Sequence, residues 1–473
     1  MQLLIYLISF LEWFTTLSIE IIAIRNFTPI IGTNSISTSI ILWVILLALS
    51  YWYYIGWKIS KDKTINQIWY RVASNLTIAA IFYLFITFIF DKYILVYLIE
   101  TTQNYFISIL VSSFILFFIP VFLASQTIPL LSELLKWNNT WEKIWKLLFF
   151  STIGSFLWSV LTSTTLFAYL WVEKSAVFNI AILSFLAIVI LSITYKNITK
   201  LTVLSTFIFL ISLTILGSDK KLNPWIIYEH ANSYHNIQVI ETSDWRRLFL
   251  QNNWFASWIL VDKKESFFKY IIEIKNQIIN NSDKNILIIW WAGFTLPNEL
   301  SKKEFVENID VVDVDKSLKN ISEKYFLQEE LNKKVVFNPV PSRFFINNAI
   351  KNKIKYDSIV IDIYVWNSLA PQTLTYEFFE NLNKISDKIY INLITDKELK
   401  SDFSKKVLNT MLEAFWDLYY KNVNQEWEYS LTNFVVTNKK IEWYKEYINN
   451  NELWIYIDNK NSIEIDLFKI IDN

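Results

Sequence analysis

The pattern of hydrophobic and polar positions divides the chain into two parts near residue 218. Before this point, apolar runs of membrane-spanning length follow one another, whereas after it charges are frequent and the apolar runs shrink to strand length. The first part contains about seven candidate membrane spans, at residues 2–24, 38–57, 74–98, 105–125, 147–171, 176–194 and 199–217. The sequence therefore predicts a helical transmembrane domain over residues 1–217, followed by a linker at 218–224.

The soluble part opens with a region, 225–262, in which apolar and polar residues alternate. Turn residues at Asp244-Trp245 and Asn252-Asn253 interrupt the alternation, which is typical of antiparallel hairpins. From residue 263 to 473 we expect one further domain, in which helical and strand patterns alternate. The strands are expected at 285–290, 309–314, 333–337, 356–363 and 387–394, and the helices at 263–281, 295–303, 316–329, 342–352, 373–383 and 399–413. This order predicts a doubly wound, Rossmann-like α/β sheet.

Two acidic residues, Glu12 and Glu20, lie inside the first candidate span. An ionisable group at membrane depth usually faces the interior of a bundle or a polar cavity. Two interpretations stay open: Glu20 is a pathway or ligand residue, or these are helix-packing carboxylates paired with a neighbour such as Arg25. We favour the second interpretation.

Composition removes several classes of function. The net charge is zero and no basic stripe with interleaved aromatic residues is found, so we expect no nucleic-acid partner. The absence of cysteine excludes disulfides and thiolate metal sites. The two histidines, His230 and His235, are too few and too close together for a histidine-based metal cluster, and we expect no metal.

Three features of the soluble part converge on one edge of the expected sheet. In such folds, ligands bind at the carboxyl ends of the strands. The turn of Trp290, Trp291, Ala292 and Gly293 follows the first strand, where backbone N–H groups would meet a ligand. Asp313 ends the second strand, about 20 residues on, where an acid commonly binds ribose hydroxyls. Asp362 ends the fourth strand and is placed to meet a reactive group above the sheet. An aspartate at a strand end is also a common cap, but the three features in this order favour an adenosyl-binding site.

Tryptophan stands in places where glycine is expected. The chain has 5 glycines and 21 tryptophans, whereas glycine normally makes up roughly 7% of residues. Trp290 and Trp291 occupy a turn that needs glycine, Trp245 a hairpin turn, and Trp416 the end of an expected helix. Some uncultivated bacterial lineages read the codon UGA as glycine. We therefore predict that many of these tryptophans are glycines translated with the wrong table; an aromatic-rich membrane protein is the alternative.

With glycine in these places, the chain resembles the spermidine synthase family of aminopropyltransferases, in its membrane-fused form. "NILIIWWAGFTLPNEL" (285–300) is similar to the family's glycine-rich cofactor loop, and "VVDVD" (311–315) to its Val-Glu-Ile-Asp segment. "YDSIVIDIY" (356–364) is similar to the strand that carries the catalytic aspartate. Residues 11–32 and 46–60 resemble the first two membrane helices of the fused proteins. The resemblance extends to about residue 420 and implies a fold of the methyltransferase type.

The resemblance implies roles for the site residues. Asp313 would hold the ribose of the adenosyl substrate. Asp362 would be the general base that takes a proton from the acceptor amine, because an amine that is cationic at neutral pH becomes a nucleophile only after it loses a proton. The substrate would be decarboxylated S-adenosylmethionine or S-adenosylmethionine.

The chain also departs from the family, mainly where a polyamine would bind. The second acid of the catalytic strand is replaced by Val365, and the family's Asp-Glu-x-x-Tyr-His-Glu segment keeps only Asp262. The family's glutamine falls on Phe255, and its acid before arginine falls near Pro341. A polyamine needs several carboxylates, so we expect an acceptor other than ordinary putrescine.

The sequence therefore predicts a membrane-anchored transferase that acts on a small amine or another nucleophile. The alternative is a non-catalytic domain that senses an adenosyl metabolite or is coupled to transport. A homodimer formed through the C-terminal domain is a further expectation. The lysines and arginines lie after the second, fourth and sixth spans, which by the positive-inside rule places the soluble part outside. An adenosyl substrate made inside the cell argues for the cytoplasm, which we favour.

Overall fold

A computed structural model describes most of the chain. The described residues are 2–31, 35–60, 63–90, 93–102, 104–135, 140–195, 197–218, 223–232, 234–289, 292–362, 371–426, 431–449 and 452–471. They form two compact units, one built mainly from residues up to 221 and the other mainly from residues after it. The two units are considered separately below.

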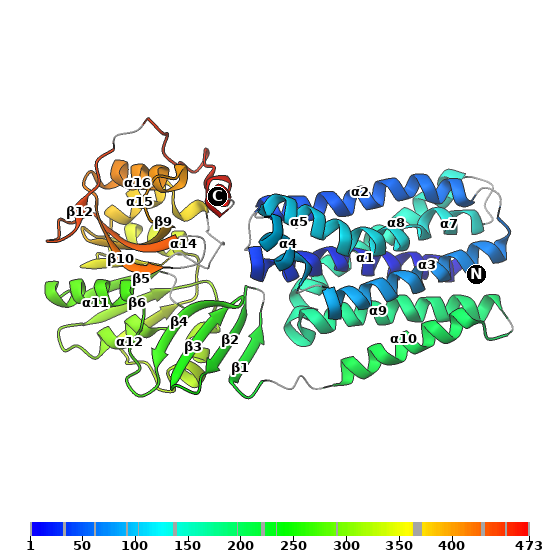
Figure 1. The fold of residues 1–473 in the computed structure, drawn as a ribbon, viewed down its shortest axis with the longest axis horizontal. Coiled ribbons are helices and arrows are strands. Elements are labelled where there is room, and N and C mark those ends of the chain that lie inside the picture. The colour runs from blue at the N-terminus through cyan, green and yellow to red at the C-terminus, as the bar shows by residue number, and fades with distance from the viewer. Residues whose placement is uncertain are drawn as a thin grey trace. The chain divides into compact units, whose positions relative to one another are not determined.

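The N-terminal unit consists mainly of helices (Figure 1). Its α-helices are α1 (Gln2–Ile31), α2 (Ser35–Ser60), α3 (Ile65–Phe85), α4 (Ile94–Thr102), α5 (Tyr105–Ser113), α6 (Ile119–Ala124), α7 (Thr127–Leu134), α8 (Thr140–Leu161), α9 (Phe167–Thr194) and α10 (Lys200–Gly217). Three π-helical segments continue these helices: η1 (Ile86–Phe90), η2 (Phe114–Phe118) and η3 (Thr162–Leu166).

Seven stretches of this unit are long and apolar enough to cross a membrane, as the hydropathy pattern predicts. They are Gln2–Thr28, Ser35–Gly56, Ile65–Phe88, Tyr105–Leu134, Ile144–Leu166, Tyr169–Thr194 and Lys200–Gly217. The predicted start of the third span at residue 74 is wrong, because the helix begins at Ile65. Thr64 caps this helix by accepting a hydrogen bond from the backbone N–H of Gln67, whose side chain accepts one from the backbone N–H of Thr64. This capping box lies in a polar stretch, which is why an apolar window misses it.

The C-terminal unit begins with a four-stranded antiparallel sheet in the order β1-β2-β3-β4. Its strands are β1 (Ile226–Ala231), β2 (Asn236–Glu241), β3 (Arg246–Gln251) and β4 (Trp254–Leu260). The turns lie where the sequence predicts them, since Trp245, Asn252 and Asn253 all have positive φ. The helix expected from residue 263 begins only at Lys269, because Ser266 still pairs with Ile259.

The second sheet of this unit has eight strands in the order β12-β10-β11-β9-β8-β5-β6-β7. They are β5 (Asn285–Ile289), β6 (Asn308–Val312), β7 (Val335–Asn338), β8 (Ser358–Ile361), β9 (Ile389–Asp396), β10 (Tyr419–Glu426), β11 (Leu431–Thr437) and β12 (Lys445–Glu446). Strands β5 to β9 are parallel, as predicted for a doubly wound fold. The last three strands extend the sheet in antiparallel pairs, which the predicted alternation does not include.

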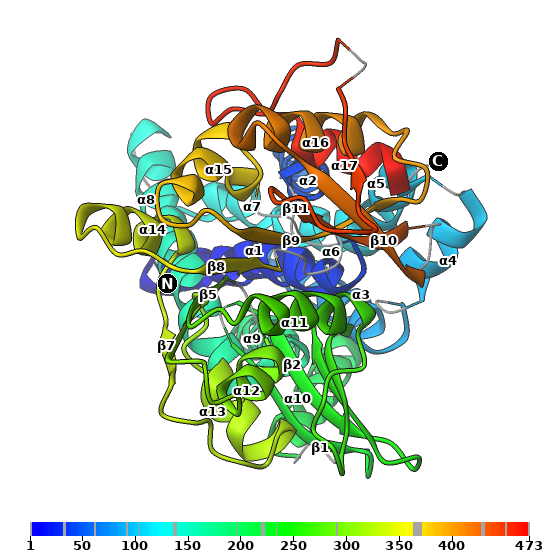
Figure 2. The ribbon, with the colours of Figure 1, turned by 90° about the vertical axis from the view of Figure 1, so that its left-hand side faces the viewer.

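Helices cover both faces of this sheet, with α15 and α16 above it and α11 and α12 below it in Figure 2. Leu287 and Ile289 of β5 point into one hydrophobic core, and Ile286 and Ile288 into the other. Burial on both faces explains the unbroken apolar run of this strand. The helices are α11 (Lys269–Asn281), α12 (Thr295–Ser301), α13 (Leu318–Ile321) with η4 (Ser322–Phe326), α14 (Ser342–Lys351), η5 (Pro371–Thr373), α15 (Tyr376–Asn383), α16 (Asp402–Phe415) and α17 (Ile463–Ile471).

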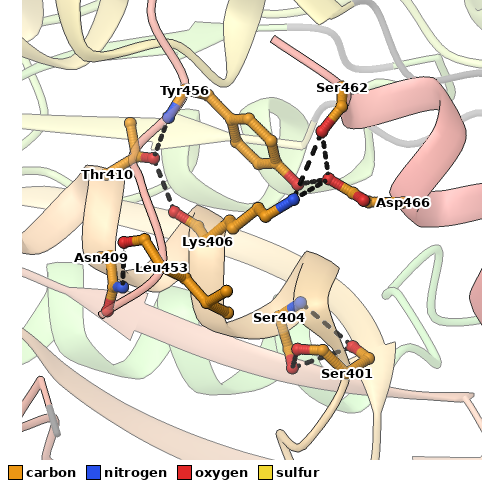
Figure 3. Close-up of polar contacts among 9 residues, drawn as sticks. All are labelled: Ser401, Ser404, Lys406, Asn409, Thr410, Leu453, Tyr456, Ser462 and Asp466. Atoms are coloured by element: carbon orange, nitrogen blue, oxygen red, sulfur yellow. Dashed lines mark hydrogen bonds and ion pairs between the residues drawn. The ribbon is translucent and has the colours of Figure 1, made fainter. Parts of the chain in front are cut away.

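A buried ion pair fixes the C-terminal segment to α16 (Figure 3). The ammonium of Lys406 lies 2.8 Å from Oδ2 of Asp466, and both side chains are almost fully buried. The hydroxyl of Tyr456 donates a hydrogen bond of 3.0 Å to the same carboxylate, and the ring of Trp454 lies under the ammonium. These contacts form a structural clamp between α16 and α17.

Among the described residues, four tryptophans have a backbone that favours glycine. Trp171, Trp245, Trp416 and Trp443 have φ between 60° and 73°, a region that side chains with a Cβ rarely adopt. Trp416 lies directly after α16, where the sequence predicts a glycine cap. Trp245, Trp416 and Trp443 are 71%, 85% and 84% exposed, so buried contacts do not hold their indoles in place. These conformations agree with glycine at these positions, and the recoding itself stays a prediction.

Candidate functional site

The predicted site residues lie at the carboxyl edge of the eight-stranded sheet. Asp313 directly follows β6 and Asp362 directly follows β8, and these strands flank β5 on its two sides. The backbone N–H of Asp362 donates to the carbonyl of Ile289, the last residue of β5. Because neighbouring strands lie about 4.8 Å apart, the two aspartates stand roughly 10 Å apart across the end of β5. The structure therefore brings both to one edge.

Asp362 is held by hydrogen bonds from two other elements. The hydroxyl of Tyr270 on α11 donates to Oδ2 at 2.7 Å, and the amide of Asn392 on β9 donates to Oδ1 at 2.8 Å. The amide of Asn433 on β11 in turn donates to Oδ1 of Asn392 at 2.6 Å. Burial raises the pKa of Asp362 to about 6, although the hydrogen bonds from Asn392 and Tyr270 act in the opposite direction. Asp362 is thus a half-buried carboxyl that two hydrogen bonds hold in place and whose pKa is raised toward the neutral range.

Sequence reasoning missed Tyr270, Asn392 and Asn433. Burial and the neighbouring Asp362 raise the pKa of Tyr270 well above its usual range, so its phenol stays protonated and donates. The amides carry a detectable signal, because each interrupts an otherwise apolar buried strand, in "IYINLI" (389–394) and "LTNFVV" (431–436). A buried polar side chain in such a strand needs a partner. The signal does not name that partner, since the contact depends on the sheet order.

Asp313 lies in a second polar group, with Asp315, His235 and Gln251. Oδ1 of Asp313 accepts a hydrogen bond of 2.8 Å from the backbone N–H of Asp315, so the side chain caps the end of its strand. A ring nitrogen of His235 lies 3.9 Å from Oδ2 of Asp315 and 3.5 Å from the amide of Gln251. Burial raises the pKa of Asp313 to about 6, with His235 acting to lower it. The capping role that the sequence left open is therefore present, and His235, which directly precedes β2, lies beside the group.

The turn after β5 is described in part. Trp290 and Trp291 lie outside the described residues, whereas Ala292 and Gly293 are described. A Cβ on Gly293 would stand 2.3 Å from the side chain of Ser257 and 2.8 Å from the ring of Phe326. The carbonyl of Gly293 accepts a hydrogen bond of 2.7 Å from Ser322. Glycine is needed here because the turn packs closely against β4 and η4. This packing explains the glycine without an adenosyl ligand, and the predicted role of the turn in binding such a ligand stays a prediction.

The departures from the family have different structural settings. Val365 lies outside the described residues. Asp262 is exposed in the turn after β4. Arg343, which follows Pro341 at the start of α14, forms a two-pronged ion pair with Asp458, at 2.7 and 2.6 Å. Arg343 therefore binds the C-terminal segment through Asp458. Within the described ranges, no group of three or more His, Cys, Asp or Glu side chains is arranged to hold a metal ion.

This arrangement is that of a doubly wound α/β domain with acidic residues at the carboxyl ends of two parallel strands that flank β5. About half of the chain is similar in sequence to polyamine aminopropyltransferases, which confirms the resemblance drawn from its motifs. That of Vibrio vulnificus is 25% identical over 229 residues, which is 46% of this chain and 75% of the relative. That of Methanocaldococcus jannaschii is 23% identical over 165 residues, 34% of this chain and 53% of the relative. No family model matches the chain.

Two spermidine synthases of solved structure align with about half of the chain, with TM-scores below 0.4. A probable spermidine synthase from Corynebacterium glutamicum aligns over 49% of this chain and 84% of its own, with a TM-score of 0.39 and 16% identity. The spermidine synthase of Thermotoga maritima aligns over 51% of this chain and 84% of its own, with a TM-score of 0.37 and 16% identity.

Proposed function

We propose that this protein is a membrane-anchored aminopropyltransferase that uses decarboxylated S-adenosylmethionine, with Asp362 as its general base. S-adenosylmethionine, and hence methyl transfer, is the alternative donor. The observation that carries the proposal is the setting of Asp362: a half-buried carboxyl at the carboxyl end of β8, held by hydrogen bonds from α11 and β9, with a pKa raised to about 6. A general base works best when its pKa lies near the working pH. The sequence relatives are named polyamine aminopropyltransferases.

The reaction follows from this setting. Asp362, in its ionised form, takes a proton from the ammonium of the acceptor. The freed lone pair of the nitrogen attacks the aminopropyl carbon next to the sulfonium of the donor. The carbon–nitrogen bond forms as the carbon–sulfur bond breaks, and the electron pair stays on sulfur, which leaves as a neutral thioether. The proton remains on Asp362 until it passes to solvent.

The hydrogen bonds from Tyr270 and Asn392 fix the orientation of the Asp362 carboxylate for this step. Both donors stabilise the ionised form, which burial disfavours. In this proposal Tyr270 and Asn392 are positioning residues, and Asn433 positions Asn392. Asp313 would bind the ribose hydroxyls of the donor with the oxygen that does not cap the strand, and His235 lies beside this group.

The acceptor is a small amine with fewer positive charges than the family's polyamines. The family's acidic positions fall on Val365, Pro341 and the segment 262–268, of which only Asp262 is a matching acid. A cationic acceptor with several ammonium groups would lack partners there. We place the C-terminal unit in the cytoplasm, where the donor is made, with the seven apolar helices in the bilayer and the homodimer as a further expectation.

Product analysis tests the proposal. The full chain, with glycine at the predicted positions, is incubated with each adenosyl donor and a panel of mono-, di- and triamines. Mass spectrometry should show an amine heavier by one aminopropyl group and one equivalent of the thioether. If the donor binds but no aminopropylated or methylated product forms with any acceptor, the domain is a sensor of an adenosyl metabolite.

A further inference from the structure

The helical N-terminal unit buries one carboxylate that the transferase chemistry does not use. Glu12 lies in α1, and among the described residues of this unit it is the only acidic side chain that is buried. Oε1 accepts a hydrogen bond of 2.8 Å from the hydroxyl of Thr16, one turn further along. Oε2 is buried and has no hydrogen-bond partner. An unpaired carboxylate in a membrane span is expensive, and such residues mark binding sites or pathways.

Glu12 belongs to the face of α1 that points into the bundle. Ile5, Ile8, Thr16 and Ile19 share this face at helical spacing, and all of them are buried. The opposite side of α1 packs on α8, where the backbone carbonyl of Phe10 approaches Gly154 closely. The carboxylate is therefore directed toward the interior of the bundle and away from the lipid.

The described basic side chains around α1 are engaged elsewhere. Lys174 on α9 donates to the carbonyls of Leu216 and Ser218. Lys146 on α8 pairs with Glu142 at 2.9 Å. Arg25 lies on α1 itself but 13 residues further on, roughly 20 Å along the axis. Oε2 of Glu12 therefore has no ion-pair partner among these three basic side chains.

Other hydrogen-bonding groups are buried in the same unit without partners. The amide nitrogen of Asn179 on α9 donates to Ser18 of α1 at 2.6 Å, which leaves Oδ1 of Asn179 with no partner. Neither amide atom of Gln126, between α6 and α7, has a partner, although its side chain is 1% exposed. Both α7 and α9 pack against α1. Buried polar groups are normally satisfied, so Oδ1 of Asn179 and the amide of Gln126 are, like Oε2 of Glu12, buried groups available to a polar ligand.

The chemistry of these groups favours an ammonium over a metal ion. Within the described part of the chain no three metal-ligating side chains come together, whereas Ca²⁺ takes six to eight oxygen ligands. An ammonium carries three N–H donors and one positive charge, which suit a carboxylate and a few neutral oxygens. The aliphatic neighbours Ile8 and Ile19 suit the methylene chain of such a ligand.

We propose that the N-terminal unit binds an aliphatic amine, whose ammonium pairs with Oε2 of Glu12. The proposal rests on the proposed function, because it assigns the amine class handled by the C-terminal unit to a second site inside the helical bundle. The bundle would then hold or pass on the substrate or product of the transferase, in addition to anchoring it.

Photolabelling locates this site directly. An aliphatic monoamine that carries a diazirine is irradiated with the full chain in lipid nanodiscs, and labelled peptides are mapped by mass. We expect label on peptides of α1, α7 or α9, displaced by butylamine and retained with 1-butanol, which has the same carbon chain but no charge. Glu12→Gln should reduce this label at least tenfold. Glu133→Gln, which removes an exposed carboxylate from α7, should leave it unchanged.

Two results would overturn the proposal: label confined to the C-terminal unit, or label on the bundle that Glu12→Gln leaves intact. Glu12→Asp guards against misfolding, since it keeps the charge and should retain part of the label if the bundle is intact. The same preparation is assayed for product. Glu12-dependent label without any product would refute the proposed transferase function and support the bundle site. Product without Glu12-dependent label would refute the bundle site alone.

Discussion

The hydroxyl of Tyr270 donates a hydrogen bond of 2.7 Å to Oδ2 of Asp362, although the two residues are 92 positions apart. Tyr270 lies in the first turn of α11 and Asp362 at the end of β8, so the contact joins a covering helix to the carboxyl edge of the sheet. Because the bond favours the ionised carboxylate, it opposes the effect of burial on the pKa of Asp362.

Tyr270→Phe should therefore raise the pKa of Asp362 above about 6. The base works only when ionised, so in the unmodified protein kcat/KM should fall as pH drops through about 6. In the variant, this acid limb should move to higher pH, with most of the activity recovered in alkaline buffer. Tyr356→Phe is the matched control, because Tyr356 also donates to an aspartate, Asp310, but precedes β8. A pH–rate profile unchanged by Tyr270→Phe would contradict the positioning role.

Asp313→Ala should weaken binding of the adenosyl donor by about 1–3 kcal/mol, the usual consequence of removing one partner of a buried polar contact. Calorimetry with donor or thioether product measures this change. Asp313 also accepts a hydrogen bond from the N–H of Asp315, so the melting temperature should fall as well. Asp313→Asn separates the effects, because the amide oxygen can still cap the strand. Unaltered affinity in the alanine variant would mean that Asp313 is a cap alone.

Trp416→Gly should stabilise the C-terminal unit. The residue has φ 71° and is 85% exposed, so glycine removes an unfavourable backbone conformation of about 1–2 kcal/mol while little packing is lost. Trp258→Gly is the control, since Trp258 lies in β4 and stacks on Phe267, and its loss should lower the melting temperature. Peptide mass spectra of protein from the native source test the recoding itself. Glycine masses at 290 and 291 would support it, and indole masses there would refute it.

Removing one partner of the Lys406–Asp466 pair should destabilise the C-terminal unit strongly. Both side chains are more than nine-tenths buried, so Lys406→Met leaves an uncompensated buried carboxylate, which typically costs about 3–5 kcal/mol. Lys384→Met breaks an exposed pair with Glu380 and should change stability by about 1 kcal/mol or less. Urea titration of the full chain compares the two. An equal loss of unfolding free energy in the two variants would show that burial does not strengthen the contribution of the Lys406–Asp466 pair to stability.

The fold could be predicted from sequence where local pattern decides it. The apolar run of β5, followed by alternating helix and strand patterns, predicts that the strands of the second sheet are parallel. The turn at Asn252-Asn253 is predicted by its residue types. The antiparallel strands β10 and β11 were not predicted as part of this sheet, because their place depends on long-range pairing with β9 and with each other, and β12 has only 2 residues. For the site, Asp313 and Asp362 could be found because strand ends share one edge. Tyr270 and Asn433 could not, because their contacts depend on long-range packing.

The central claim is that Asp362 removes a proton from the acceptor amine, and Asp362→Asn tests it most directly. Asparagine keeps the shape of the side chain, can still accept a hydrogen bond from Tyr270 or Asn392, and cannot take the proton. Single-turnover rates with saturating donor and amine should fall roughly 10²–10⁴-fold, with donor affinity nearly unchanged. If the variant retains a rate within a few-fold of the unmodified protein, Asp362 is a structural residue of the strand end, and the proposed mechanism is wrong.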